Sequence, residues 1–166
     1  MRLYPPRRYE FGCDLMNDRE RFEVLDSSYL RDMAEVFRKA FENDPWNNDW
    51  SDEEQLMKYI EDIACSFNSL NYGIIIDGKL AAFSAGSVRH WWEGTNYNIE
   101  ELCVLPEFQG KGIGSRFMAL IEEDIGNRGI KGIFLQTDND MPSYRFYLKN
   151  GFSELNAHVS FYKSID

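Results

Sequence analysis

The residues with the clearest chemical pattern are Gln109-Gly110-Lys111-Gly112-Ile113-Gly114. They follow an apolar run typical of a strand and precede apolar residues at helical spacing. Glycines let the backbone approach a ligand closely and adopt positive φ, and the free N–H groups at a helix start attract anions. The sequence therefore predicts a phosphate cradle here, with Lys111 adding positive charge at its mouth. The spacing fits neither a Walker A loop nor a dinucleotide-binding fingerprint.

The elements that position this loop follow from hydrophobic periodicity. Short alternating or continuous apolar runs, bounded by turn formers such as Asp77-Gly78, are typical of strands joined in hairpins. The expected strands cover 21–25, 73–76, 80–88, 98–104 and 133–137, with one or two more over 153–163 and a loop over 89–95. The expected helices begin near Ser27 or Ser28, at Ser51, after Gly114 and at Pro142.

The order of these elements is mixed, with antiparallel hairpins early and a strand–helix–strand unit late. Such an order predicts an α/β (α+β) class. The chain has 166 residues, which fits a single domain over 1–166. We find no internal repeat, linker or low-complexity segment in the sequence.

Two motifs resemble one known family. Val104-Leu105-Pro106 with the loop 109–114 is similar to the acyl-CoA signature (Q/R-x-x-G-x-G/A) of the GNAT superfamily of N-acyltransferases. Phe146-Tyr-Leu-Lys-Asn-Gly-Phe152 resembles the family's second motif, a Tyr followed by a Gly-Phe pair. Both stand in the family's order and at its usual separation, and the similarity covers Asn98 to Phe152.

The resemblance implies a fold and a division of the chain. The fold is a single-domain GNAT-like one, with a mixed, mostly antiparallel sheet of six to seven strands, about four helices and a splayed central strand pair. The acceptor-side half covers about 1–97, and the acetyl-CoA-binding half covers about 98–166.

The resemblance also implies acetyl-CoA as co-substrate. In this family the strand before the loop pairs with the pantetheine arm, and the loop amides hold the pyrophosphate. An Asn often lies seven positions before the Tyr, where this chain has Asp140 beside Asn139. The implied cofactor-binding residues are Leu102, Cys103, Val104, Gln109, Gly110, Lys111, Gly112, Ile113, Gly114, Ser115, Asn139, Asp140 and Tyr147. No metal is expected, because the Cys and His residues lack ligand spacing.

Amide formation needs a neutral amine, removal of a proton and reprotonation of the departing thiolate. Tyr147 matches the family's Tyr, which protonates the CoA sulfur. Family members often carry a carboxylate on the strand before the loop, here Glu100 or Glu101. Strict alternation puts Glu100 on the buried face, so Glu100 is the preferred base, although a bulge would exchange the two. Asp138 and a water relay are the alternatives.

The acceptor site in this family lies beside the first two helices and the loop between them, here 44–50. Aromatic residues of this loop are expected to stack on a substrate, and its acids to hold cationic groups. The expected acceptor-binding residues are Asp44, Trp46, Trp50, Trp92, Tyr97 and Asp138. The alternative is that the Trp residues fill the core or a homodimer interface.

The formal net charge is −10 and is unevenly distributed. Between Glu10 and Asp62 there are 16 Asp or Glu and 6 Lys or Arg, whereas the rest of the chain has 12 of each. This argues against a nucleic-acid partner and an anionic membrane surface. It favours a cationic small-molecule acceptor, and the Pro-Trp-Asn loop is similar to that of aminoglycoside-acetyltransferase-like members.

The three cysteines predict no disulfide framework, and Cys65 and Cys103 lie in apolar segments that favour buried free thiols. The N-terminus has no apolar signal region, and no window approaches the ~18 apolar residues of a membrane span. These features favour the cytoplasm.

The resemblance therefore implies an N-acetyltransferase that moves an acetyl group from acetyl-CoA to a primary amine by direct attack in a ternary complex. One alternative is acetylation of a protein N-terminus or lysine. Another, from a different class, is a non-catalytic acyl-CoA-binding module, against which Tyr147 and Glu100 argue because a binder has no use for an acid and a base.

Overall fold

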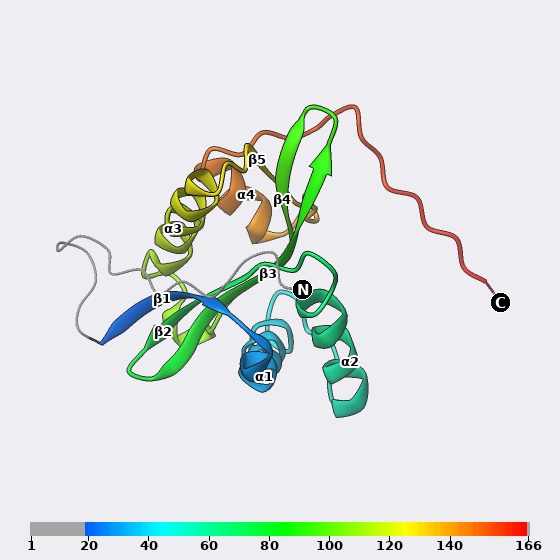
Figure 1. Ribbon diagram of the computed structural model, residues 1–166. Helices are drawn as coiled ribbons and strands as arrows, with labels where there is room; N and C mark the ends of the chain where they lie inside the picture. Colours follow the sequence, from blue (N-terminus) through cyan, green and yellow to red (C-terminus); the bar gives the residue numbers. More distant parts are fainter. Residues whose placement is uncertain (1–18, 166) are drawn as a thin grey trace. The chain divides into compact units, whose positions relative to one another are not determined.

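The computed structural model describes residues 19–165, and Figure 1 shows the ribbon. Contacts divide the chain into two compact units, one ending at Gln136 and the other starting at Thr137. The strands are β1 (Glu20–Leu25), β2 (Asn71–Ile76), β3 (Lys79–Trp91), β4 (Gly94–Val104) and β5 (Gly132–Phe134). The helices are α1 (Leu30–Phe41), α2 (Glu53–Ala64), α3 (Ile113–Asn127) and α4 (Pro142–Lys149), with short 3-10 turns η1 (Ser27–Tyr29) and η2 (Pro106–Phe108).

The strands form one mixed sheet in the order β1-β2-β3-β4-β5. Neighbours are antiparallel except β4 and β5, which are parallel. The β4–β5 ladder runs only from Asn96 opposite Gly132 to Asn98 opposite Phe134, whereas β4 continues to Val104. Beyond Asn98 one edge of β4 is therefore not paired with β5, which is the arrangement expected of a splayed strand pair.

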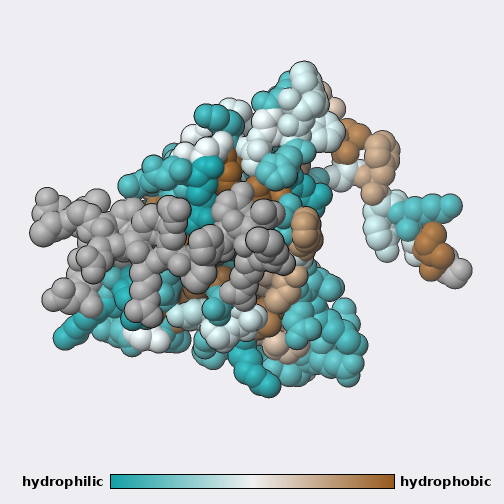
Figure 2. All heavy atoms as spheres, in the orientation of Figure 1, coloured by the Kyte–Doolittle hydropathy of each residue, from teal (hydrophilic) through white to brown (hydrophobic). Residues whose placement is uncertain are grey.

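The strand count is lower than expected: the part of the chain from 19 to 165 contains five strands rather than six to seven. The segment 153–165, where one or two strands were expected, contains none. Its apolar side chains are exposed (Figure 2); they include Leu155, Val159, Phe161 and Ile165. An alternating segment becomes a strand only when a neighbouring strand completes its hydrogen bonds, which sequence alternation alone does not supply.

The caps of the first two helical segments also differ from the prediction. The Asp26 carboxylate caps η1 by accepting a backbone N–H at 2.9 Å, and that of Asp52 caps α2 by accepting one at 3.0 Å. The sequence had favoured serines at these places, at Ser27 or Ser28 and at Ser51. Aspartate is an equally good N-cap, and its charge also interacts favourably with the helix dipole.

The face of the sheet covered by α1 and α2 holds the larger hydrophobic cluster (Figure 1). Helix residues such as Phe37 and Ile60 pack there against strand residues such as Phe83 and Cys103. The burial of Cys103 is as predicted, but Cys65 is exposed because it is the C-cap residue of α2. This cluster fixes α2 against β4, where the candidate catalytic carboxylates lie.

α3 packs on the opposite face of the sheet through an aromatic and polar contact region. Phe22 stacks on Tyr72 at 5.5 Å and meets Phe117 of α3 edge-on at 6.1 Å. The fully buried Asp124 of α3 accepts hydrogen bonds from the Tyr72 hydroxyl at 2.7 Å and from Arg128 Nε at 2.5 Å. The Tyr72–Asp124 hydrogen bond therefore ties α3 to β2, and the Asp124–Arg128 ion pair lies at the C-terminal end of α3 itself. No described helix is both long and apolar enough to cross a bilayer.

Candidate active site

The glycine-rich loop leads directly into α3. Gly110 and Gly112 have φ values of +71° and +80°, in the left-handed region where glycine is favoured. Gly112 is the N-cap of α3, and no side chain caps the helix there. The N–H groups of the first turn are thus left for a ligand. Lys111 is exposed, with its Nζ 6.0 Å from the Phe108 ring centroid.

These features fit the pyrophosphate of acetyl-CoA. A Cβ added at Gly110 or Gly112 would meet no atom within 4 Å, so the loop faces open space. Ile113, Gly114 and Ser115 form the first turn of α3 and are half-buried. The loop residues predicted from the sequence therefore lie together, with uncapped backbone donors and the exposed Lys111 side chain.

The edge of β4 beside this loop has backbone groups that point away from β3. The Leu105 N–H donates to β3 at 2.9 Å, so by strand alternation Cys103 also directs its backbone toward β3. Leu102 and Val104 then direct theirs toward the splay. The Gln109 side-chain amide donates to the Val104 carbonyl at 2.8 Å, which agrees with this direction. Backbone pairing with pantetheine thus fits Leu102 and Val104 better than Cys103, and the role of all three stays a prediction.

β4 carries a β-bulge at the candidate bases. Ala85 lies opposite Glu101, whereas the next residue, Gly86, lies opposite Ile99. Glu100 is therefore the extra residue of the bulge, and the alternation of side chains shifts by one at this point. Relative to strict alternation, Glu100 and Glu101 have therefore exchanged faces of the strand, as a bulge would cause.

Glu101 is half-buried and faces α2. Tyr59 of α2 donates a hydrogen bond from its hydroxyl to Oε1 of Glu101. Burial raises the pKa of Glu101 to about 7, the Tyr59 hydrogen bond opposes the rise, and the nearby Glu100 charge adds to it. Such a carboxyl changes charge near neutral pH, as a general base should.

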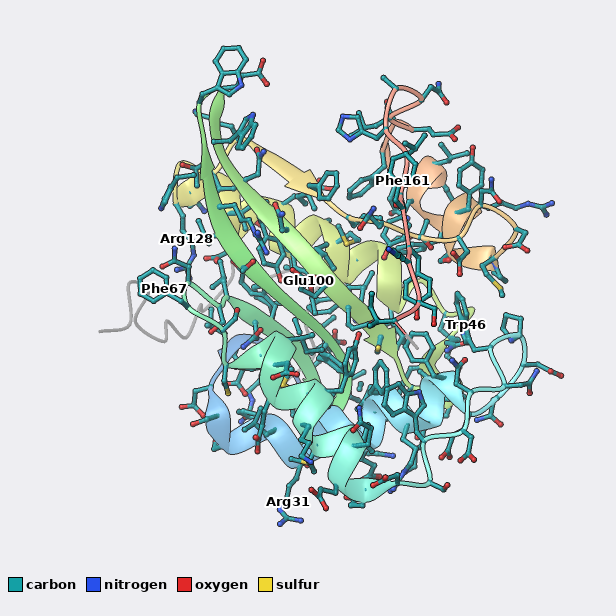
Figure 3. The ribbon with its side chains drawn as sticks, turned by 90° about the vertical axis from the view of Figure 1, so that its right-hand side faces the viewer. Arg31, Trp46, Phe67, Glu100, Arg128 and Phe161 are labelled. Atoms are coloured by element: carbon teal, nitrogen blue, oxygen red, sulfur yellow. The ribbon has the colours of Figure 1, made fainter. Side chains whose placement is uncertain are left out.

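Glu100 is exposed, contrary to the prediction that it lies on the buried face (Figure 3). Its carboxylate lies 3.7 Å from Arg89 Nη2 of β3, at a distance and exposure where an ion pair contributes little. The carboxylate in the more suitable environment is therefore Glu101.

The loop between α1 and α2 contributes to an aromatic cluster. Trp46 packs on Phe41 at 5.2 Å, and Trp50 packs on Phe37 at 5.0 Å and on Tyr59 at 5.4 Å, measured between ring centroids. Both tryptophans are half-buried on these rings (Figure 3 labels Trp46). Trp50 thus reaches Tyr59 and, through it, the candidate base. Their stacking on an acceptor stays a prediction.

The other predicted acceptor aromatics lie elsewhere. The expected loop over 89–95 is a hairpin, paired as far as Trp91 opposite Gly94, and Trp92 lies at its end with 82% of its surface exposed. Tyr97 is fully buried, hydrogen-bonded to Ser84 at 2.9 Å, so it is a core residue. This burial does not fit the prediction that Tyr97 lines the acceptor site.

Asp44 and Asp49 are exposed in the loop between α1 and α2. Asp44 accepts a hydrogen bond from the Asn47 side chain at 2.6 Å. Asp49 accepts from the Ser51 N–H at 3.0 Å, and its hydrogen bonds with Ser51 lower the pKa of Asp49. Both carboxylates thus lie at the surface of the loop. In the part of the chain that is described, no group of three His, Cys, Asp or Glu side chains is placed to hold a metal.

Tyr147 lies on α4, in the second unit. Its ring contacts those of Phe146 at 5.2 Å and Phe152 at 5.3 Å, so the aromatic residues of the second motif hold it from two sides. The predicted residues Asp138, Asn139 and Asp140 are exposed in the turn before α4. Their roles stay predictions.

Sequence reasoning missed Tyr59 and the Gln109 side-chain contact. Tyr59 stands beside Ile60 in the apolar stripe of α2, and its partner Glu101 is 42 residues away. A polar-tipped aromatic residue at the edge of an apolar stripe was the available signal.

Comparison with known sequences gives one family. The sequence model of the acetyltransferase (GNAT) family matches residues 30–152. Aminoalkylphosphonate N-acetyltransferase of Salmonella typhimurium is 35% identical over 68 residues, 40% of this chain and 43% of the relative. tRNA(Met) cytidine acetyltransferase TmcA 2 of Saccharolobus solfataricus is 31% identical over 64 residues, 39% of this chain and 8% of the relative. The matches thus span less than half the length of these curated relatives.

Solved structures share the fold at low sequence identity. AAC(6')-Iy in complex with the bisubstrate analogue CoA-S-monomethyl-acetylneamine has a TM-score of 0.67 at 18% identity, covering 89% of this chain and 99% of that one. A possible acetyltransferase from Clostridium difficile 630 has a TM-score of 0.75 at 14% identity, covering 90% and 100%. A metagenomic aminoglycoside acetyltransferase in complex with sisomicin has a TM-score of 0.68 at 19% identity, covering 90% and 98%.

Proposed function

The chain belongs to the GNAT acetyltransferase family, and from that premise we propose that it transfers an acetyl group from acetyl-CoA to a primary amine of a cationic small molecule, by direct attack in a ternary complex. The observation that carries the proposal is Glu101. It is a half-buried carboxyl with a pKa raised to about 7, on the strand that leads to an uncapped glycine loop.

The binding part of the proposal uses the chain's own backbone. Acetyl-CoA supplies an acyl thioester. The loop amides from Gly110 to Ser115 and the Lys111 side chain hold its pyrophosphate, and the outward backbone groups of Leu102 and Val104 pair with its pantetheine arm. Glycine at 110 and 112 keeps side chains out of the way of the phosphates.

The proton transfers are assigned to two side chains. Glu101, when ionised, accepts the proton of the amine as the new C–N bond forms. Tyr147 gives its hydroxyl proton to the CoA sulfur as the C–S bond breaks, a role that the family motif supports. Below pH ~7 Glu101 is increasingly protonated and stops accepting, so the rate falls on the acid side.

The acceptor is proposed to be cationic because the loop between α1 and α2 carries exposed acids, among them Asp44 and Asp49. The names of the relatives agree on amine chemistry, since one acetylates aminoalkylphosphonates and others aminoglycosides. A phosphonate brings negative charge to the acceptor and suits an acidic loop less well than an aminoglycoside does.

Release of CoA from acetyl-CoA, measured over a panel of cationic, neutral and anionic amines and of peptides, tests this function. We expect turnover with polycationic amines and an acid limb of kcat/KM with a midpoint near pH 7. Turnover only with peptides or anionic amines would contradict the acceptor class. Acetyl-CoA binding without turnover of any acceptor would instead support a non-catalytic acyl-CoA-binding module.

Glu101→Gln removes the proposed base and keeps the size of the side chain. We expect kcat/KM at pH 7 to fall by roughly 10²- to 10⁴-fold, and the remaining activity to lose the acid limb. Glu100→Gln is the matched variant one residue away, with an exposed carboxylate, and we expect a far smaller loss. If kcat/KM falls further in Glu100→Gln than in Glu101→Gln, Glu100 and not Glu101 is the general base.

A further inference from the structure

The Glu101 carboxyl has one described hydrogen-bond donor, and it comes from a different element. Within residues 19–165 only the Tyr59 hydroxyl donates to it, and it donates to Oε1. A carboxylate has two oxygens, each able to accept, so this contact leaves Oε2 for another donor. The N–H group of a neutral amine is a donor of the kind that Oε2 can take.

The Tyr59 ring is held in place by packing. Its centroid lies 5.2 Å from that of Phe37 on α1 and 5.4 Å from that of Trp50 in the following loop. Rings at these distances and tilts stabilise one another, and they limit the movement of the Tyr59 hydroxyl. The hydroxyl is therefore presented to Glu101 from a fixed direction.

We propose that Tyr59 is a positioning residue of the acetyl transfer: its hydroxyl occupies Oε1 of Glu101 and turns Oε2 to the acceptor as the oxygen that receives the amine proton. The inference rests on the proposed function and deepens it. Tyr59 itself gives up no proton. The amine nitrogen loses one to Oε2 while its lone pair forms the bond to the acetyl carbon.

The charges around Glu101 support this arrangement. Burial and the Glu101 charge raise the pKa of Tyr59, so its hydroxyl stays protonated and always donates. Burial also raises the pKa of the Cys103 thiol on the same face, so the thiol is neutral at pH 7. Glu100, paired with Arg89, is the other charged group that acts on Glu101. Because the Tyr59 hydrogen bond stabilises the ionised form of Glu101, its loss raises the pKa of Glu101.

Tyr59→Phe removes only the hydroxyl and keeps the ring contacts with Phe37 and Trp50. We expect the midpoint of the acid limb of kcat/KM to move up by roughly one pH unit, and kcat/KM at pH 7 to fall about tenfold, with the KM for acetyl-CoA unchanged. Raising the pH recovers part of this loss.

Tyr29→Phe is the matched control. Tyr29 also donates from its hydroxyl to a glutamate, Glu23 at 2.7 Å, in a partly buried contact away from the site. Loss of the Tyr29 hydroxyl is expected to leave the pH profile of kcat/KM unchanged. If Tyr59→Phe lowers the melting temperature like Tyr29→Phe but leaves the acid limb where it was, Tyr59 only supports packing and the proposal is overturned.

A second readout separates this inference from the proposed function. In protein carrying ¹³C-labelled glutamate side chains, the Glu101 carboxyl signal is assigned by its loss in Glu101→Gln, and its titration is followed in wild type and Tyr59→Phe. An upward shift of the midpoint in Tyr59→Phe supports control of Glu101 by Tyr59, and an unmoved midpoint overturns it. If Glu101 titrates as expected in the wild-type protein but the protein acetylates no amine, the proposed function is contradicted and the control of Glu101 by Tyr59 is not.

Discussion

At the scale of single residues, the site depends on which of two adjacent carboxylates is removed from water. Glu101 is half-buried against Tyr59, whereas Glu100 is exposed beside Arg89. Burial disfavours the charged form and raises the pKa of Glu101 to about 7. The sequence shows two equivalent residue types here, and their different environments distinguish them.

Gly112 offers a test of the loop at the same scale. A side chain at its φ of +80° is strained, so Gly112→Ala is expected to cost about 1–2 kcal/mol of stability and also to disturb the loop amides. We expect the KM for acetyl-CoA to rise about tenfold or more. The measurement is the KM for acetyl-CoA beside a thermal melt.

Gly78→Ala is the control for this change. Gly78 lies in the turn between β2 and β3, has the same φ of +80°, and is equally open, since a Cβ there meets no atom within 4 Å. It should therefore lose similar stability while keeping the KM for acetyl-CoA. Equal rises of KM in both variants would mean that strain, and not the loop, causes the effect.

Tyr147→Phe tests the proposed acid. Loss of the hydroxyl should lower kcat by roughly 10²-fold with little change in acetyl-CoA affinity, because proton donation acts only on the departing sulfur. Tyr144→Phe on the same helix removes a hydroxyl that donates to Glu154 at 3.1 Å and serves as the control. Full turnover by Tyr147→Phe would remove Tyr147 from this role.

At the scale of elements, the bulge in β4 determines which carboxylate faces α2. The facing strand accommodates it with Gly86, where an added Cβ would lie 2.4 Å from the Asn98 carbonyl oxygen. A larger residue there would push the strands apart. The bulge is therefore a property of the β3–β4 pair, and no pattern within β4 alone reveals it.

This explains how much of the site the sequence could predict. The glycine loop, α3 and the strand before them follow from local spacing, and the structure places them as expected. The orientation of Glu101 and the contact with Tyr59 depend on strand pairing and on packing across 42 residues. The expectation that Glu100 lies on the buried face fails for the same reason, because strict alternation does not hold through a point where the register shifts.

The attachment of α3 gives a prediction at this scale. Asp124 is fully buried and paired with Arg128. Asp124→Asn breaks the buried Asp124–Arg128 ion pair by removing one of its charges, so we expect a loss of about 3–5 kcal/mol in the free energy of unfolding. Chemical denaturation measures it. Glu123→Gln, an exposed neighbour on α3, should change stability by less than about 0.5 kcal/mol, and equal losses would contradict the argument.

At the scale of the whole molecule, the acidic excess is partly neutralised by local ion pairs. Glu54 pairs with Lys58 at 2.6 Å and Glu53 with Arg38 at 2.8 Å on the surfaces of α1 and α2. Exposed pairs of this kind reduce the field without adding much stability. Asp44 and Asp49, in the loop between these helices, are in no described ion pair, so their charges add to the negative field at the loop that we propose for the acceptor.

Ionic strength tests this field. The KM for a polycationic acceptor should rise several-fold between about 0.02 M and about 0.3 M salt, with kcat little changed, because salt screens exposed charges. Asp44→Asn with Asp49→Asn should flatten this dependence. The double variant Glu61→Gln with Asp62→Asn removes the same charge from the other end of α2 and should keep most of the salt dependence of KM. If both double variants flatten this dependence equally, only the net charge of the protein matters.

With acetyl-CoA bound as proposed, the uncapped start of α3 would couple ligand binding to folding. A helix whose N-cap is Gly112 lacks the side-chain acceptor that would stabilise its first turn. A bound pyrophosphate would supply that acceptor, so part of the free energy of holding this helix together is provided by the co-substrate. The free energy of unfolding should then rise with the concentration of acetyl-CoA. The loop that binds the co-substrate would in this way make the stability of the protein depend on how much acetyl-CoA is present.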